Sequence, residues 1–267
     1  MIEWLWLAPG LVLAGLAGGL LAGLFGIGVG VVLVPLMAGL LPLPGVEEAL
    51  RIKLAIGTSL AMTVPTSWLA ARGHAARGTL DAALLRRLAP GMLVGVGMGV
   101  VLAGWVAGAL LVLVFGVVAL VVAGLFLMPG MRLGAALPGG LAGQALAGVV
   151  GGVSAMMGVG GGTLGVPALV LFGVPVGRAI GTAAGFGVMI AAPASLGLVL
   201  AGWGQEGLGA GALGFVSLPA VALILPPAML ATPWGVRLAQ RLPGRVLRLG
   251  FAAMMAALGL RMLASLI

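Results

Sequence analysis

Apolar residues run almost continuously along the chain, and only short polar segments interrupt them. The runs are unbroken rather than alternating at every second residue, which favours helices over strands. A helix that crosses a bilayer needs about 20 predominantly apolar residues, and most of the runs come close to this length or exceed it. The pattern predicts an all-α polytopic membrane protein with apolar runs at about 4–25, 30–42, 54–71, 88–104, 106–128, 137–157, 163–173, 179–201, 212–236 and 246–267.

The composition agrees with this environment and argues against several classes of function. Hydrophobic residues make up 62% of the 267 positions and charged residues 7%, whereas soluble domains carry about 25% charged residues. The chain has no cysteine, one histidine, and five acidic residues that all lie near the chain start or in predicted loops. We therefore expect no enzyme activity, no metal site and no cofactor. The net charge of +8 lies mostly in loops, where topology and lipid headgroups explain it better than a nucleic-acid partner.

Two runs, 30–42 and 163–173, are too short to cross a bilayer, and each follows a cluster of glycines. The clusters belong to an internal repeat whose order is preserved along the chain. It predicts an N-terminal transmembrane repeat at 1–131 and a C-terminal one at 132–267, within one integrated membrane domain. The matches are Gly26, Gly28, Gly30, Val34 and Pro35 with Gly158, Gly160, Gly162, Val166 and Pro167; Ala55-Ile56-Gly57-Thr58 with Ala179-Ile180-Gly181-Thr182; and Gly78, Pro90 and Gly99 with Gly214, Pro226 and Gly235.

Basic residues indicate how the two repeats are oriented. Loops on the cytoplasmic side of a membrane are enriched in Lys and Arg. An odd number of crossings in each half places ten basic residues on that side and leaves Arg51, Lys53 and Arg261 on the other. The halves are then inverted, and each glycine cluster reverses the chain within the membrane, as a discontinuous or re-entrant helix pair. The ten are Arg72, Arg77, Arg86, Arg87, Arg132, Arg178, Arg237, Arg241, Arg245 and Arg248.

The glycine clusters are the strongest candidates for a functional site. Non-helical backbone is tolerated at membrane depth where it is buried in protein or lines a cavity, and the helix that follows begins with free N–H groups and a positive dipole end. Two such helix starts, facing each other, would form an anion site. The alternative is that the glycines serve only close helix packing. The candidate substrate-binding glycines are Gly26, Gly28, Gly30, Gly158, Gly160, Gly161 and Gly162, with Thr163 at the second helix start.

Hydroxyl side chains near the repeated motifs are further candidates. Thr58, Ser59 and Thr182 lie early in apolar runs, and Ser154 precedes the second cluster. Each could donate a hydrogen bond to a substrate oxygen, or could bond the backbone carbonyl one turn back instead. Ser67 and Ser195 are expected to shape helices.

Other polar residues have weaker claims to a functional role. Gln144 is expected to join two helices rather than to face substrate, and His74 is expected to be solvated in an Arg-rich loop. Arg51, Lys53 and Arg178 flank helix starts on opposite faces. They could draw anions into two vestibules, or could anchor the helices by snorkelling.

These motifs together resemble the TauE/SafE sulfite exporter family, also called TSUP. The resemblance rests on the duplicated Gly-x-Gly-x-Gly…Pro block, Gly57-Thr58-Ser59 with Gly181-Thr182, and the segment from Trp234 to Leu263, and it covers nearly the whole chain. Family membership implies a multi-pass carrier in the bacterial inner membrane for sulfite, sulfoacetate or related organosulfonates. In the second half Ala183 stands where the first has Ser59, so that half offers one hydroxyl fewer.

The function we expect is a secondary transporter that exports a small sulfur-containing anion by alternating access. No carboxylate lies within an apolar run, which argues against a proton relay through the membrane. Two alternatives stay open: a channel-like anion pathway, and a membrane assembly partner that transports nothing. The partners expected are the small anion and the lipid bilayer, with a homo-oligomer also compatible with the sequence.

Overall fold

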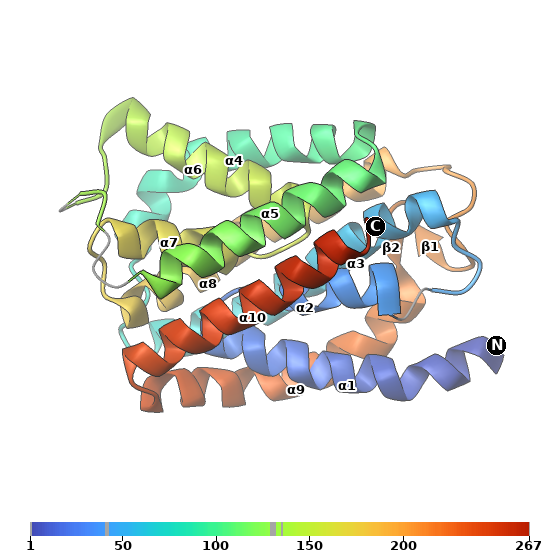
Figure 1. Cartoon of the computed structure of the whole chain (residues 1–267), viewed down its shortest axis with the longest axis horizontal. Coiled ribbons are helices and arrows are strands. Elements are labelled where there is room, and N and C mark those ends of the chain that lie inside the picture. The colour runs from blue at the N-terminus through green and yellow to red at the C-terminus, as the bar shows by residue number, and fades with distance from the viewer. Residues whose placement is uncertain (1, 41–42, 129–131, 135, 267) are drawn as a thin grey trace.

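The computed structural model describes residues 2–40, 43–128, 132–134 and 136–266. Helices dominate this part of the chain, as the hydropathy pattern predicts, with one short β-hairpin (Figure 1). The elements are α1 (Ile2–Phe25), α2 (Gly30–Pro35), the π-helix η1 (Leu36–Leu40), α3 (Glu48–Ala75), α4 (Ala82–Trp105), α5 (Gly108–Leu127), α6 (Gly140–Met157), α7 (Gly162–Leu171), α8 (Val176–Ala201), β1 (Ala212–Leu213), β2 (Val216–Ser217), α9 (Leu218–Arg241) and α10 (Gly244–Ala264).

Eight of the helices in the described residues are long and apolar enough to cross a membrane. The shorter apolar helices are α2 with η1 and α7, which correspond to the two short runs of the sequence. Each of these follows a long helix and doubles back beside it, so that α1–α2 and α6–α7 form hairpins (Figure 1). The protein is therefore a multi-pass helical membrane protein that contains two helical hairpins.

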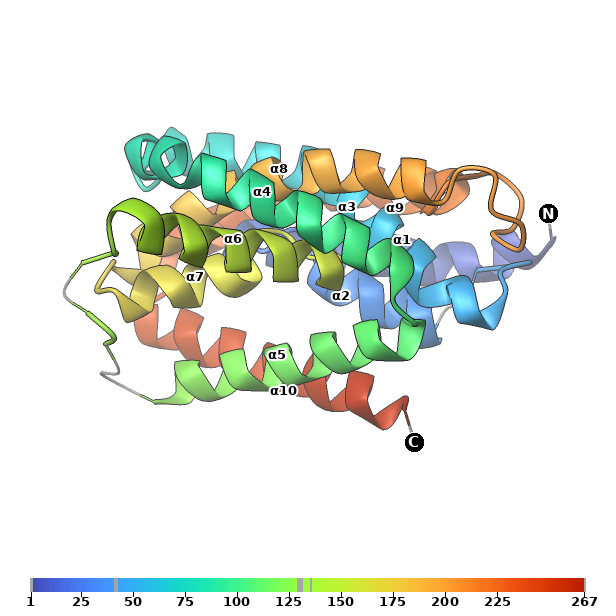
Figure 2. The same cartoon turned by 90° about the horizontal axis from the view of Figure 1, so that it is seen from above.

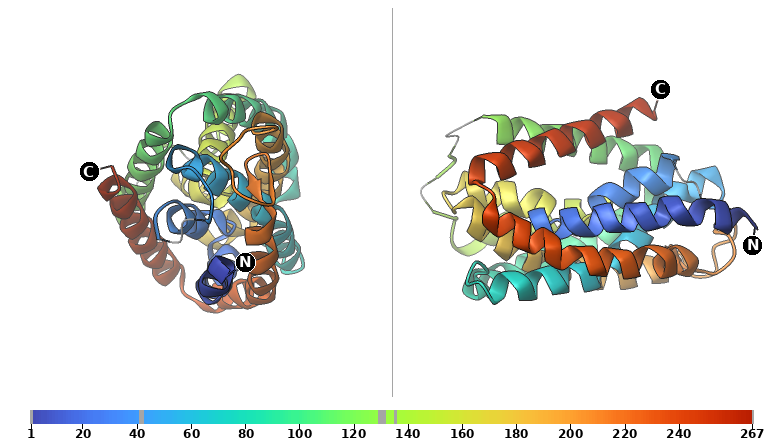
Figure 3. Two further views of the ribbon diagram at one scale, coloured as in Figure 1. Left: turned by 90° about the vertical axis from the view of Figure 1, so that its right-hand side faces the viewer. Right: turned by 90° about the horizontal axis from the view of Figure 1, so that it is seen from below.

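The two hairpins enter the bundle from opposite ends. We call the end where both chain termini lie the terminal end, and the other the opposite end (Figures 1 and 3). The α1–α2 hairpin starts and returns at the terminal end, whereas α6–α7 starts and returns at the opposite end. Figure 2 shows α5 and α10 side by side along one flank of the bundle, and the two helices are in contact through Gly116 and Gly259.

Helix starts recur at the spacings of the sequence repeat. The helices α2 and α7 start at Gly30 and Gly162, 132 positions apart. The pairs α4 and α9, and α5 and α10, each start 136 positions apart. The packing recurs as well, because α1 packs along α9 in the way that α6 packs along α4.

Basic residues are divided unequally between the two ends. The ends of α3 and α9, the starts of α4, α8 and α10, and the loop before α6 all lie at the opposite end (Figure 1). These segments hold the ten arginines that the sequence assigns to one side of the membrane. Arg51, Lys53 and Arg261 belong to segments of the terminal end.

Glycines let the helices of these pairs touch along their backbones. A Cβ added at Gly95 of α4 would lie 2.6 Å from Gly148 Cα of α6, and one added at Gly99 would lie 2.9 Å from Gly152 Cα. On the other side of the bundle, a Cβ at Gly19 of α1 would lie 2.6 Å from Ala228 Cα of α9. Such contacts give membrane helices the close packing that lipid alone does not drive.

We predict that Gly95→Ala lowers the melting temperature of the purified protein, whereas Gly97→Ala on the same helix leaves it unchanged. The added methyl at position 95 would collide with α6, and overpacking of this kind costs about 1–3 kcal/mol. Gly97 is exposed, and a Cβ added there would meet open space. Thermal unfolding in detergent measures both variants, and equal melting temperatures would show that α4 and α6 are not in backbone contact.

Candidate functional site

The two glycine turns meet in the interior of the bundle. Gly160 N donates a 3.0 Å hydrogen bond to Ile27 O, so the second turn is joined directly to the first. A Cβ added at Gly30 would lie 3.1 Å from Val159 Cα, and one added at Gly162 would lie 2.6 Å from Ile27 Cα. Both turns interrupt the helical backbone and are fully buried. The structure thus brings together the seven glycines that the sequence singled out.

Backbone conformation explains why glycine is needed in these turns. Gly26, Gly28 and Gly158 have φ of 67°, 71° and 71°, a region that side chains with a Cβ rarely adopt. Space is equally restricted, because a Cβ on Gly158 would lie 2.7 Å from Ile56 Cα of α3. These glycines therefore serve close packing, and they also leave backbone amides uncovered.

Several of those amides have no acceptor. Among the hydrogen bonds of the described residues, none is donated by the N–H groups of Val29 and Gly30 at the start of α2 or by those of Gly161, Gly162 and Thr163 at the start of α7. The first N–H groups of a helix carry its positive dipole end. Two sets of unpaired donors therefore lie on turns that touch each other, an arrangement suited to an anion.

Four buried hydroxyls around the turns also have no hydrogen-bond partner among the described residues: Thr63, Ser67, Ser154 and Thr163. Thr63 lies between the turns, since its Oγ1 is 2.9 Å from a Cβ built on Gly28 and its Cγ2 is 3.1 Å from one built on Gly160. Ser67 is close to the second turn: a Cβ built on Gly187 would lie 2.8 Å from Ser67 Cβ and 3.7 Å from Gly161 N.

Sequence reasoning named Ser154 and Thr163 for this site and missed the other two hydroxyls. Ser67 was expected only to shape a helix, and Thr63 was given no role. The available signal was the spacing of Ser59, Thr63 and Ser67, because hydroxyls four residues apart share one face of a helix. Ser59 Oγ lies within hydrogen-bond distance of Gly158 O in the second turn, so this face of α3 is the one that contacts the turns.

Thr58 and Thr182 make the same contact in the two halves of the chain. Thr58 Oγ1 accepts a 2.9 Å hydrogen bond from Ser217 N at the start of α9. Thr182 Oγ1 accepts one of 3.1 Å from Asp81 N at the start of α4. We call these contacts the threonine bridges. Each hydroxyl accepts a bond here, so its own proton can still be donated to another group. A role for either threonine as a donor to substrate therefore stays a prediction.

The three predicted vestibule residues lie away from the turns and at different ends. Arg51 and Lys53 line a cavity of about 710 Å³ at the terminal end, and Lys53 Nζ donates a 2.7 Å hydrogen bond to Gly104 O. Arg178 lies at the opposite end, where its Nη2 is 3.4 Å from Asp81 Oδ2 in an exposed ion pair. An exposed pair of this kind contributes little to stability.

His74 does not lie in solvent, which corrects the sequence expectation. Its side chain is 1% exposed near the end of α3. Its Nε2 is 3.3 Å from Gly23 O of α1, and its Nδ1 is 3.4 Å from Gln240 Nε2 of α9. The imidazole therefore links three helices. Among the described residues, no group of three or more His, Cys, Asp or Glu side chains is placed to hold a metal ion.

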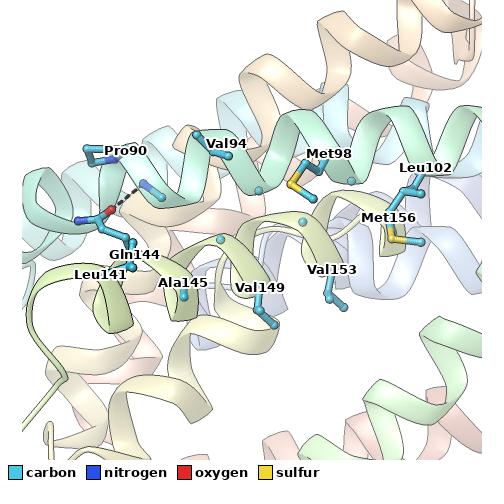
Figure 4. Close-up of a pocket in the computed structure, with 15 residues that line it drawn as sticks. Pro90, Val94, Met98, Leu102, Leu141, Gln144, Ala145, Val149, Val153 and Met156 are labelled. Carbon is cyan, nitrogen blue, oxygen red and sulfur yellow. Dashed lines mark hydrogen bonds between the residues drawn. The ribbon is translucent and has the colours of Figure 1, made fainter.

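Gln144 joins α4 to α6, in line with the expectation that it connects helices. Its Oε1 accepts a 2.6 Å hydrogen bond from Gly91 N (Figure 4). Its Nε2 donates one of 2.7 Å to Arg87 O. It lines a groove of about 620 Å³ between these helices whose other lining residues are apolar. This groove suits lipid tails and offers an anion little.

The site at the turns is closed in this structure. The residues of both glycine turns and the four unpaired hydroxyls around them are buried, and no turn residue lines the terminal-end cavity or the α4–α6 groove. The amides and hydroxyls there become accessible only if the packing around them opens.

Comparisons with known proteins agree with this picture. The family described as "Sulfite exporter TauE/SafE" matches residues 11–262. A protein of Haemophilus influenzae described as a "Probable membrane transporter protein" is 30% identical over 255 residues, which cover 94% of this chain and 96% of that protein. No solved structure matches significantly.

We predict that Thr182→Val lowers the melting temperature, whereas Thr182→Ser preserves it. Valine has nearly the shape of threonine but cannot accept the Asp81 N–H bond, and an unpaired buried donor costs about 1–3 kcal/mol. Serine retains the acceptor. Thermal unfolding of both variants measures the effect, and a valine variant that melts with the serine variant would show that the bridge contributes no stability.

Proposed function

Because the chain belongs to the sulfite exporter TauE/SafE family, we propose that it exports sulfite, sulfoacetate or a related organosulfonate across the bacterial inner membrane by alternating access. The observation that carries this proposal is the contact between the two glycine turns, with unpaired amides on both and unpaired hydroxyls packed around them. A bound oxyanion would take up donors that otherwise remain unsatisfied in a buried site, where each costs about 1–3 kcal/mol.

An inverted duplication is part of the proposal. The recurring helix starts, the matching helix pairs and the two threonine bridges support a common origin of the two halves. The hairpins that enter from opposite ends support their inversion (Figure 1). Carriers built in this way bind substrate near the middle of the membrane, between the repeats, which is where the two turns would lie.

The substrate-binding groups that we propose are the glycine-turn amides, Ser154, Thr163, Thr63 and Ser67. All of them are neutral, so the site would hold an anion without a full positive charge in the membrane. Hydrogen bonds to a charged group contribute about 1.5–3 kcal/mol each. A small anion with several oxygens can use a number of these donors at once, which suits sulfite and the sulfonate group.

The direction of transport follows from the membrane potential. We place the opposite end, which holds ten arginines, in the cytoplasm according to the positive-inside rule. A cytoplasm that is negative by 100 mV favours the exit of each negative charge by about 2.3 kcal/mol, so export needs no coupled ion. The closed site favours a carrier over an open channel, because a carrier exposes its substrate to one side at a time.

We predict that the purified protein releases sulfite or sulfoacetate from proteoliposomes at a saturable rate that rises when the lumen is made negative. The reason is that a net negative charge leaves in each cycle. Anion release against protein-free liposomes, measured over a range of concentrations and potentials, tests this prediction. Equal release with and without protein would end the proposal, and a rate that never saturates would favour a channel.

We further predict that Ser67→Ala lowers the kcat/KM of efflux by about tenfold, which corresponds to about 1.4 kcal/mol, with Thr63→Val acting in the same direction. Both changes remove an unpaired donor beside the turns and leave the helix intact. Ser195→Ala is the matched control, because the Ser195 hydroxyl already bonds Ala192 O. A control that loses as much activity as Ser67→Ala would remove these hydroxyls from the site.

A further inference from the structure

Two cavities at opposite ends of the bundle are lined by corresponding residues of the two halves. The terminal-end cavity is lined by Pro35, Ala38, Gly39, Val112, Arg261 and Met262, among others. The opposite-end cavity is lined by Pro167, Val170, Leu171, Arg248, Leu125 and Phe126, together with Met128. Pro35, Ala38 and Gly39 precede Pro167, Val170 and Leu171 by 132 positions each. On α5 and α10, Val112 precedes Arg248, Leu125 precedes Arg261 and Phe126 precedes Met262 by 136 positions each. Both values are offsets of the sequence repeat. The two cavities are therefore equivalents of each other.

These equivalent cavities differ greatly in size. The one at the terminal end has about 710 Å³ and the one at the opposite end about 40 Å³. An apolar groove of about 290 Å³ between α5, α6 and α7 adjoins the small cavity and shares Leu125, Pro167 and Leu171 with it, so the opposite end remains the less open even with this groove included. The backbone differs at the same place: after Pro35 the chain continues as the π-helix η1, whereas after Pro167 α7 stays α-helical to Leu171. Ala38 and Gly39 of η1 line the large cavity, and a Cβ built on Gly39 would lie 3.3 Å from Arg261 Nη2.

The helix α10 supplies an arginine to each cavity. Arg261 lines the large one and Arg248 the small one, while the equivalent positions on α5 are the apolar Leu125 and Val112. Arg248 is half-buried, and its Nε is buried with no hydrogen-bond partner among the described residues. Arg51 and Lys53 also line the large cavity, with Glu48 as an acidic neighbour.

We propose that these cavities are two vestibules that open in alternation, and that in this structure the terminal-end vestibule is open while the turns themselves stay closed. In this proposal Arg261 and Arg248 each capture the anion on their own side. The guanidinium presents donors in a fork that matches two oxygens of one oxyanion. A basic cleft with low-dielectric walls also raises the local concentration of anions and their rate of entry. The roles of the two arginines rest on the proposed function, whereas the unequal opening of the vestibules does not.

The opening can be tested without any substrate, by measuring how accessible an introduced thiol is. The chain has no cysteine, so a single introduced thiol is the only one that reacts. Ala38→Cys and Val170→Cys place single thiols at equivalent positions of the two vestibules. In lipid nanodiscs, where both ends face the buffer, we expect a polar methanethiosulfonate reagent to modify Ala38→Cys at least roughly tenfold faster, since the rate follows the population of the open state. Equal rates, or a faster Val170→Cys, would overturn the assignment of this state.

The roles of the arginines are tested by measuring sulfite flux in proteoliposomes in which all copies of the protein have the same orientation. Arg245→Gln is the control, because Arg245 lies on the same helix and is exposed. We expect Arg248→Gln to raise the KM for sulfite loaded from the opposite end by roughly tenfold and to leave kcat unchanged. Arg261→Gln should have the same effect on sulfite loaded from the terminal end. The reason is that each change removes the charge that steers anions into one vestibule. A change that is equal in both directions, or no larger than that of the control, would overturn the roles of the arginines. If the unmodified protein carries no sulfite, the proposed function fails, and the thiol rates still decide whether the vestibules are unequal.

Discussion

A peptide group in hydrocarbon must find its hydrogen-bond partner within the protein, and the two glycine turns are where this chain meets that constraint. Each turn breaks a helix in the interior, and each could be stable there only against another part of the protein. The bond from Gly160 N to Ile27 O and the contact of Gly162 with Ile27 show that each turn packs on the other. The contact that permits two buried reversals therefore also creates the candidate site, since the amides left unpaired lie on the same surfaces.

The repeated Ala-Ile-Gly-Thr motif shows how one structural solution serves both halves. In each copy the glycine packs against a loop of the other half of the chain: Gly57 of α3 against Phe215, before α9, and Gly181 of α8 against Thr79, before α4. The threonine then accepts the N–H two residues further along that loop. The helix-capping residue of each loop is the one that donates this bond: Asp81 caps α4 and Ser217 caps α9. In this way the motif fixes where α4 and α9 begin relative to α3 and α8.

Hydropathy was enough to predict the spanning helices and the two short ones, because lipid demands a continuous apolar length from each segment. Helix ends were harder to place: α3 covers 48–75 whereas its apolar run covers 54–71, since polar residues extend a helix beyond the hydrocarbon. Contacts between distant segments left no local signal. The burial of His74 depends on Gly23 and Gln240, and the position of Thr63 depends on two turns that lie more than a hundred residues apart in the chain.

Charge distinguishes the two halves as well as backbone geometry does. The helix α5 carries no charged residue over its 20 positions, whereas its counterpart α10 carries Arg245, Arg248 and Arg261. A duplicated scaffold provides two equivalent openings, which in the proposed cycle open in alternation. Arginine from a single helix would then make both openings attractive to an anion, while the neutral donors at the turns hold it weakly enough to leave. Because the capture sites act in either direction, the membrane potential and the anion gradient would determine the net flow.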